Sequence, residues 1–546
     1  MSRLLRPLIP DSGRPQVHWT GLHGSAAALA LAEAAVVDQR PWLVIEPDSR
    51  SLERRRAELG FFAPAELRVL TLPDGEVLPY DVFSPHPDIT SERLLALAEL
   101  PTLRRGVLLV TVDTLLQRLA PLQYVASRSF SLAVGERLAL EAFRLRLAEA
   151  GYSSVSQVAG PGEYAMRGSL LDVFPMGTNS PLRIDLFDDE IEAIRSFDPQ
   201  TQRSQDTLDS IRLLPAREMP LDGDSVRAFR RRYRTRFEGD PTRSAIYRGV
   251  SDGIAPAGIE FYLPLFFDET ATLFDYLPAN AVIVDLTSDL DGTIEKAWQA
   301  LEARYEDRCG DLERPLLRPE ELFIDGAAVG NSIASRPTIT LQSFRQEAAG
   351  PETCDFGSRL PQELRLDARA EKPLAPLQSF LANHPGRVLL AADSPGRREV
   401  LGELLRGAHL KATPCEGWAQ FVAGNAALAL TVAPELAGLA LNEPPLVVLS
   451  ESQLFGTRAR QERRRRKVTA DPNAILRDLQ SLTAGAPVVH EEYGVGRYVG
   501  LQVMEVGGQS GEFLVLEYQG GDRLYVPVHS LRSEEHTSEL QSPYVI

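Results

Sequence analysis

The first 120 residues alternate short, apolar, β-rich runs with amphipathic helical stretches. Residues 42–45 are typical of a buried strand, residues 51–59 of a helix, and residues 106–112 of a further strand. This alternation predicts an α/β fold with a parallel, doubly wound sheet. Ligands of such sheets bind at the carboxyl ends of the strands, so the first strand-to-helix turn is the first place to look for a site.

That turn, residues 21–25, has the sequence Gly-Leu-His-Gly-Ser and precedes a helical stretch. The amides at a helix N-terminus can hold a phosphate. A working phosphate loop also needs a Lys and a Ser or Thr hydroxyl, whereas three alanines, residues 26–28, follow here. The residues alone allow two interpretations, an ordinary tight turn and a degenerate nucleotide loop. Neither is expected to hydrolyse a nucleotide. The loop would comprise Gly21, Gly24, Ser25 and Ala27.

The length of 546 residues predicts about three to five domains rather than one core. The formal charge of -17 repels nucleic acid, so a contact with DNA would need a local basic patch. The run from residue 458 to 467 is one candidate, since it contains Arg463, Arg464, Arg465 and Arg466. Its composition leaves two interpretations open, a solvated linker between domains and a contact with nucleic-acid phosphates.

Two further segments differ in pattern from the α/β regions. From about residue 130, a helix and short alternating strands predict a small α+β insert. Within it we expect Arg167, Arg183 and Phe187 to share a face with Asp188, because strand residues two apart point the same way. Arginine and aromatic residues commonly anchor protein interfaces, and an ordinary polar sheet face is the alternative. The β-rich pattern from residue 487 predicts a small SH3-like barrel.

The three cysteines lie far apart, without a histidine at metal-ligand spacing. They indicate neither a disulfide framework nor a zinc site, and no metal site is expected. The apolar runs are too short to cross a bilayer. We therefore expect a cytoplasmic protein that does not contact a membrane.

Several long motifs, in order, resemble the amino-terminal half of the bacterial transcription-repair coupling factor family over residues 1–531. The resemblance is carried by residues 78–87, 162–177, 187–191, 256–260 (Pro-Ala-Gly-Ile-Glu), 264–267 (Pro-Leu-Phe-Phe), 489–500 and 524–528 (Leu-Tyr-Val-Pro-Val).

The resemblance implies a domain organisation. Residues 1–128 and 214–345 would form a UvrB-like α/β domain with a degenerate phosphate loop, interrupted at 129–213 by an α+β insert that binds the damage-recognition protein UvrA. An α/β domain of unknown role at 352–456, a basic linker at 457–480 and an SH3-like domain that binds RNA polymerase at 481–531 would follow. Residues 532–546 do not match the family and are interpreted as a non-native tail.

The resemblance also implies partners and site residues. Contacts with UvrA are expected from Arg167, Arg183, Phe187 and Asp188, and contacts with the polymerase β subunit from Tyr493, Arg497, Gly500 and Met504. No catalytic residue and no cofactor are expected in this segment. The family continues into an ATP-driven translocase on double-stranded DNA, for which ATP and Mg²⁺ are expected.

The function that this resemblance implies is the coupling of stalled RNA polymerase to nucleotide excision repair. Two alternatives from other classes are an independent ATP-dependent, UvrB-like helicase and a scaffold without catalysis. The alanines at residues 26–28 disfavour the helicase, and the basic run would be unexplained in a pure scaffold.

Overall fold

The computed structural model describes residues 4–342, 350–366, 372–433, 435–456, 487–490, 494–506, 509–518, 523–527 and 540–541. The chain divides into two compact units, residues 1–460 and residues 461–546. Among the described residues, no helix is both long enough and apolar enough to cross a bilayer.

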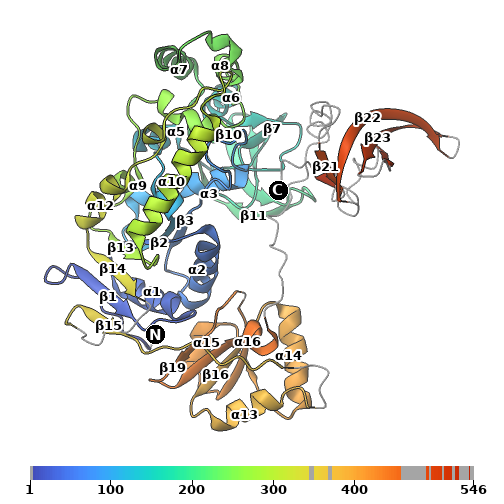
Figure 1. Ribbon diagram of the computed structural model, residues 1–546. Helices are drawn as coiled ribbons and strands as arrows, with labels where there is room; N and C mark the ends of the chain where they lie inside the picture. The colour runs from blue at the N-terminus through green and yellow to red at the C-terminus, as the bar shows by residue number, and fades with distance from the viewer. Residues whose placement is uncertain are drawn as a thin grey trace. The chain divides into compact units, whose positions relative to one another are not determined.

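A seven-stranded parallel sheet forms the centre of the first unit (Figure 1). Its strand order is β15-β1-β14-β13-β2-β4-β3, so strands from before and after the insert belong to one sheet. The predicted parallel sheet is confirmed. The strands are β1 (Gln16–Thr20), β2 (Pro41–Glu46), β3 (Val69–Leu72), β4 (Gly106–Thr111), β13 (Val282–Asp285), β14 (Thr338–Gln342) and β15 (Thr353–Asp355).

Helices connect these strands and cover the sheet. The strands β2 and β4 are buried along their whole length, which explains their uninterrupted apolar sequences. The helices are α1 (Ala26–Val37), α2 (Ser49–Phe62), α3 (Pro87–Glu99), α4 (Val112–Leu115), α5 (Leu122–Arg128), α7 (Gly223–Arg236), α8 (Ala245–Ser251), α9 (Leu273–Tyr276), α10 (Leu290–Arg308), α11 (Pro319–Leu322) and α12 (Gly326–Ala334), with the 3₁₀ turns η1 (Leu100–Thr102), η2 (Pro241–Arg243) and η3 (Ile259–Leu265).

The insert is closed at its base by two antiparallel strands, β5 (Phe130–Ala133) and β12 (Ser210–Leu213), so the chain enters and leaves side by side. Helix α6 (Leu140–Glu149) is followed by Gly151 at φ 90°, a left-handed conformation that glycine adopts without strain. A six-stranded sheet has the order β11-β10-β9-β8-β7-β6. Its strands are β6 (Ser153–Ser154), β7 (Glu163–Arg167), β8 (Leu170–Val173), β9 (Leu182–Phe187), β10 (Glu190–Phe197) and β11 (Ser204–Leu208).

A second α/β sheet has the order β17-β18-β16-β20-β19, in which only β19 is antiparallel to its neighbour. The sequence predicts a linker over residues 345–372, but β15 lies within this range and pairs with the edge strand β1, where it satisfies backbone groups that would otherwise be unpaired. The elements are α13 (Ala375–Asn383), β16 (Arg387–Ala392), α14 (Pro395–Gly407), β17 (Thr413–Pro414), α15 (Trp418–Ala423), β18 (Leu428–Val432), β19 (Leu439–Leu441), β20 (Leu446–Ser450) and α16 (Glu451–Phe455).

The two α/β sheets of the first unit share one apolar core. The ring of Trp418 on α15 packs against Phe61 and Phe62 at the end of α2, with ring centroids 6.1 Å and 4.9 Å apart. The same core contains residues of α1, β2 and β20. The second α/β domain is therefore packed on the first by buried apolar side chains.

The second unit contains a five-stranded antiparallel sheet of order β24-β23-β22-β21-β25. The strand β25 lies in the segment that the sequence interprets as a non-native tail, and it pairs with β21. Closure of this sheet into an SH3-like barrel stays a prediction. The strands are β21 (Pro487–His490), β22 (Gly494–Val506), β23 (Gln509–Glu517), β24 (Arg523–Pro527) and β25 (Leu540–Gln541).

Candidate functional site

One face of the insert's sheet is open to solvent at the tips of two hairpins. Arg167 on β7 pairs with Leu170 on β8, which in turn pairs with Asp185 on β9. Arg183 and Phe187 lie two residues before and after Asp185 on the same strand, so they share its face. We call these five residues, Arg167, Leu170, Arg183, Asp185 and Phe187, the insert face.

Phe187 is the aromatic residue of the insert face, and 76% of its full accessible surface is exposed. It ends β9, and the next residue, Asp188, lies in the hairpin turn with φ 61°. Asp188 is exposed, but it belongs to the turn and not to the strand. The sequence expectation that it follows the strand alternation is therefore wrong, because the turn reverses the chain at this residue.

Arg183 is held in place by several contacts. Its guanidinium donates to both carboxylate oxygens of Asp172, at 2.7 Å and 2.9 Å, and it lies 4.7 Å from the ring centre of Phe197. The hydrogen bond to Asp172 raises the pKa of Arg183 above its usual value. Since Asp172 is buried, this pair satisfies a charge that would otherwise be costly to bury.

Sequence reasoning missed Leu170 as a member of the insert face. Its side chain is 37% exposed, and its neighbour Asp185 is ion-paired with Arg195 on β10. An apolar residue three positions after Arg167 gave no signal by itself, because its place opposite Asp185 follows from strand register. Leu170 and Phe187 give this polar face two exposed apolar side chains.

The glycine turn at residues 21–25 is filled by the second α/β domain. Gly21 and Gly24 have φ values of 67° and 59°, and the Ser25 amide donates to the Gly438 carbonyl oxygen at 2.8 Å. A Cβ atom on Gly24 would lie 2.2 Å from that oxygen. The His23 amide donates to the Ser358 hydroxyl, which donates to the Gly21 carbonyl. Protein atoms thus occupy the positions from which a phosphate would accept hydrogen bonds.

A buried charge cluster lies next to this turn. Arg55 contacts Glu46 at 2.8 Å and Glu58 at 2.9 Å, and all three side chains are buried. Burial raises the pKa of Glu46, while the charge of Arg55 opposes this shift. The Ser25 hydroxyl, which a nucleotide site would offer to Mg²⁺, donates instead to Glu58 at 2.7 Å.

The turn therefore does not fit ATP. Ala27 is buried and offers no polar group, and the Ser25 amide and hydroxyl are both engaged. The cation of the adjacent cluster, Arg55, is already paired with Glu46 and Glu58.

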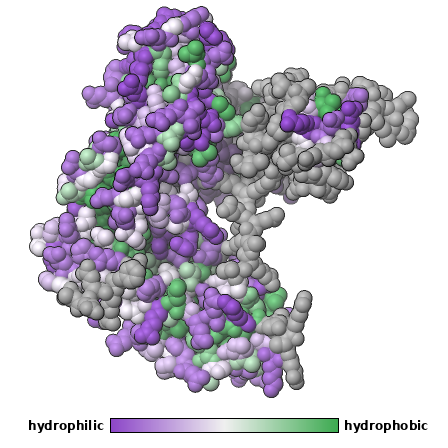
Figure 2. Space-filling model, in the orientation of Figure 1, coloured by the Kyte–Doolittle hydropathy of each residue, from purple (hydrophilic) through white to green (hydrophobic). Residues whose placement is uncertain are grey.

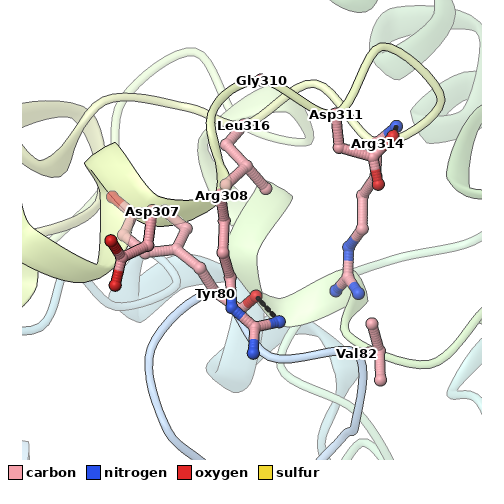
Figure 3. A pocket seen from close by; sticks show the side chains of 8 residues that line it. All are labelled: Tyr80, Val82, Asp307, Arg308, Gly310, Asp311, Arg314 and Leu316. Carbon is pink, nitrogen blue, oxygen red and sulfur yellow. Dashed lines mark hydrogen bonds between the residues drawn. The ribbon is translucent and has the colours of Figure 1, made fainter.

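Three arginines hold the loop of residues 78–87, and two of them, Arg308 and Arg314, line a pocket of about 270 Å³. Arg304, Arg308 and Arg314 donate to the carbonyl oxygens of three successive residues, 79, 80 and 81. Figure 3 shows the guanidinium groups of Arg308 and Arg314 pointing toward this loop. Ser84 joins the loop to another motif of the resemblance, residues 256–260, because its hydroxyl donates to Glu260 at 2.7 Å.

The second unit contains only part of the predicted polymerase contact among its described residues. Arg497 is exposed on β22 opposite Glu517, and Gly500 lies at an irregularity in the pairing with β23, with φ 151°. Met504 lies further along β22, opposite Gly511. Tyr493 and the basic run Arg463 to Arg466 lie outside the described residues.

Three family models match the chain. They are described as the UvrB interaction domain, over residues 130–219, the MFD D3 domain, over residues 380–454, and the CarD-like/TRCF RID domain, over residues 482–533. The first covers the insert with its insert face, the second lies within the second α/β domain, and the third covers the β-rich unit.

Curated relatives are similar along nearly the whole chain. The transcription-repair-coupling factors of Haemophilus influenzae and Escherichia coli (strain K12) are 39% and 40% identical over 510 and 511 residues, 93% of this chain and 44% of each relative. That of Myxococcus xanthus is 30% identical over 95% of this chain and 45% of the relative. The chain thus spans less than half the length of these relatives.

Proposed function

This chain belongs to the transcription-repair-coupling factor family over the part that it spans, and we propose that it is the docking half of such a factor. In this proposal the insert recruits UvrA, and the β-rich unit binds the β subunit of RNA polymerase. A stalled polymerase is thereby coupled to nucleotide excision repair in the cytoplasm. The observation that carries the proposal is the insert face, an exposed aromatic side chain on the same strand face as a fixed arginine, in a domain that matches the UvrB interaction model.

The geometry of the insert face suits a protein partner. Interface hot spots are enriched in aromatic and arginine side chains. A side chain that is already held in place loses less conformational entropy when a partner binds. Phe187 offers a large apolar surface to a partner, and Arg183 is fixed by Asp172 and Phe197. Arg167 and Asp188 lie exposed near them and would form the polar rim of the contact.

For the polymerase contact we propose the part of strand β22 that carries Arg497, Gly500 and Met504, together with Tyr493. A glycine at an irregular position in the strand pairing lets a partner backbone approach closely. The match to the CarD-like/TRCF RID model supports this assignment.

ATP-dependent translocation on double-stranded DNA, with ATP and Mg²⁺ as its cofactors, we assign to the part of the family's length that this chain does not span. Within this chain the glycine turn does not fit a nucleotide, which disfavours the independent helicase. An ATPase assay of the purified chain with duplex DNA tests this point, and turnover above that of a buffer control would contradict it.

The docking proposal is tested by capture of purified UvrA and of purified polymerase β subunit on the immobilised full chain. We expect both to be retained. The variants Phe187→Ala and Arg497→Ala separate the two contacts, since the first should release only UvrA and the second should weaken only the β subunit. Retention of neither protein by the parent chain would refute the proposal.

A further inference from the structure

Helix α7 is strongly basic within an acidic chain. Its 14 residues include one acidic residue, Asp224, and six arginines. The helix therefore has a formal charge of +5 (6 - 1), whereas the whole chain has -17. A charge of this size on one short helix is the local basic patch that a contact with nucleic acid requires. The arginines are Arg227, Arg230, Arg231, Arg232, Arg234 and Arg236.

Half of these arginines are neutralised by neighbouring carboxylates. Arg227 pairs with Asp224 on its own helix, Arg232 with Asp268, and Arg236 with Glu321. The other three, Arg230, Arg231 and Arg234, have no carboxylate within ion-pair distance in the part of the chain that the structure describes. Arg248 on the adjacent helix α8 also has no carboxylate within that distance among the described residues. We call Arg230, Arg231, Arg234 and Arg248 the α7–α8 arginine face.

Three of the four unneutralised arginines, Arg230, Arg234 and Arg248, are nevertheless held in place. The guanidinium groups of Arg230 and Arg234 lie 5.9 Å and 5.5 Å from the ring centre of Tyr247, which is buried on α8. Arg248 donates to the carbonyl oxygens of Thr242 and Arg243, at 2.7 Å and 3.1 Å. These contacts restrict the side chains without compensating their charges, so a polyanion that binds here loses less conformational entropy.

The surface around these residues is polar. Arg231, Arg234 and Arg248 are exposed and Arg230 is half-buried. The surface over α7 and α8 in Figure 2 is largely hydrophilic. Protein interfaces have an apolar core from which charges are depleted, and an arginine face of this kind lacks that core. Phosphates, by contrast, are bound by guanidinium groups through paired, charge-assisted hydrogen bonds.

We propose that the α7–α8 arginine face binds the phosphate backbone of double-stranded DNA. The contact is independent of base sequence, because backbone phosphates carry no sequence information. The proposal does not include the basic run at residues 463–466. The choice of duplex DNA among nucleic acids rests on the proposed function in DNA repair, whereas the phosphate chemistry rests on the arginines alone.

The test is the binding of a fluorescein-labelled 20-base-pair duplex to the full chain, followed by fluorescence anisotropy at several salt concentrations. The test variant carries Arg230→Gln, Arg231→Gln, Arg234→Gln and Arg248→Gln. The matched control neutralises four exposed arginines elsewhere, with Arg50→Gln, Arg144→Gln, Arg212→Gln and Arg365→Gln. A third variant replaces Arg463 to Arg466 with Gln and measures the contribution of the basic run.

The test variant should bind about 10- to 100-fold more weakly at 100 mM salt, and its slope of log K against log salt should be less steep by about 3.6, or about 0.9 for each of four phosphate contacts. Unchanged affinity and slope, an equal loss in the control, or no binding by the parent chain would each overturn the proposal. Replacement of the four residues by Lys, which keeps the charge, should retain most of the affinity, and urea unfolding of each variant detects misfolding.

Two further measurements identify the ligand. Vesicles that contain phosphatidylserine test whether the face binds any anionic surface, and tighter binding to vesicles than to DNA would overturn the DNA assignment. Capture of UvrA and of the polymerase β subunit by the test variant should be unchanged. Loss of DNA binding with intact capture, and loss of capture with intact DNA binding, therefore distinguish the failure of this inference from that of the docking proposal.

Discussion

The glycine turn and the insert face are both places where a ligand would be sought, yet one is closed and the other is open. At the turn, the Gly438 carbonyl accepts from the Ser25 amide, and the hydroxyl of Ser25 is bound to a buried carboxylate. At the insert face, Phe187 keeps three quarters of its surface exposed. The difference teaches that polar groups satisfied inside the chain are unavailable to a ligand, whereas groups left open to solvent are available to one.

The same distinction separates arginines of identical chemistry. Arg55 is buried between two carboxylates, and Arg183 is half-buried with one. Arg231 on α7 is exposed and has no carboxylate partner among the described residues. We therefore expect substitutions of buried charges to change the free energy of unfolding, and substitutions on open faces to change affinity.

The largest expected effect is that of Glu58→Ala in the buried cluster. Removal of this carboxylate leaves Arg55 with one partner and the Ser25 hydroxyl with none, and breaking a buried pair costs about 3–5 kcal/mol. Urea unfolding of the full chain measures the loss. The control is Glu53→Ala on the exposed face of α2, which should cost less than about 0.5 kcal/mol. Equal losses of unfolding free energy in Glu58→Ala and Glu53→Ala would contradict the expected difference between buried and exposed charges.

The next effect is a pH dependence of the free energy of unfolding that is caused by Glu260. Burial raises the pKa of this carboxyl to about 7, and the charge of Glu218 adds to the shift while Ser84 and Arg93 oppose it. Between about pH 4.5 and 7 the unfolded chain has lost this proton and the folded chain still holds it. The free energy of unfolding should therefore fall as pH rises through this window, by about 3 kcal/mol.

Urea unfolding at pH 5, 6, 7 and 8 measures this dependence. The variant Glu260→Gln keeps the size and a hydrogen-bonding group but cannot ionise, so its stability should change much less over the same window. An identical pH dependence in parent and variant would show that Glu260 is not the group responsible.

A smaller effect is expected from Gly24→Ala, which tests whether the second α/β domain closes the turn. The left-handed φ and the clash with the Gly438 carbonyl oxygen should together cost about 2–3 kcal/mol. Gly253→Ala is a matched control, because Gly253 has φ 73° but no atom near its absent Cβ, so only about 1 kcal/mol is expected. If both variants lose the same stability in urea unfolding, the contact with Gly438 contributes nothing.

The smallest free-energy change is expected from Phe187→Ala, and it should appear in binding rather than in folding. Loss of an aromatic anchor costs about 2 kcal/mol, or about 30-fold in the Kd for UvrA measured by surface plasmon resonance. The unfolding free energy should stay unchanged, because Phe187 is 76% exposed. Leu145→Ala, an exposed apolar residue on α6 of the same insert, is the control and should leave the Kd unchanged.

Much of the architecture could be predicted from local pattern. The apolar runs that became β2 and β4 were long enough to indicate strands buried on both faces, and their alternation with helices predicted a parallel sheet. The strand β15 could not be predicted in this way. It has only three residues and an unremarkable sequence, and it is a strand because the edge of β1 offers it hydrogen-bond partners.

The candidate site shows the same division. Phe187 and Arg183 could be selected because strand alternation placed them on one face, but Leu170 required the register between β8 and β9. Which arginines of α7 are neutralised could not be predicted from the sequence, because two of the three neutralising carboxylates come from distant residues. Asp268 and Glu321 are far from the helix in sequence, and only the packed chain shows which arginines they neutralise.

The sequence by itself determined the α/β alternation, the acidic balance, the alanines after the glycine turn and the motifs of the family, because these are properties of neighbouring residues. The tertiary structure alone decided that the turn is filled by the Gly438 carbonyl, that Arg183 is fixed by Asp172, and that four arginines of α7 and α8 have no carboxylate partner within the described part of the chain. Hydrogen bonds and ion pairs act over a few ångströms, so residues far apart in the chain meet only after folding.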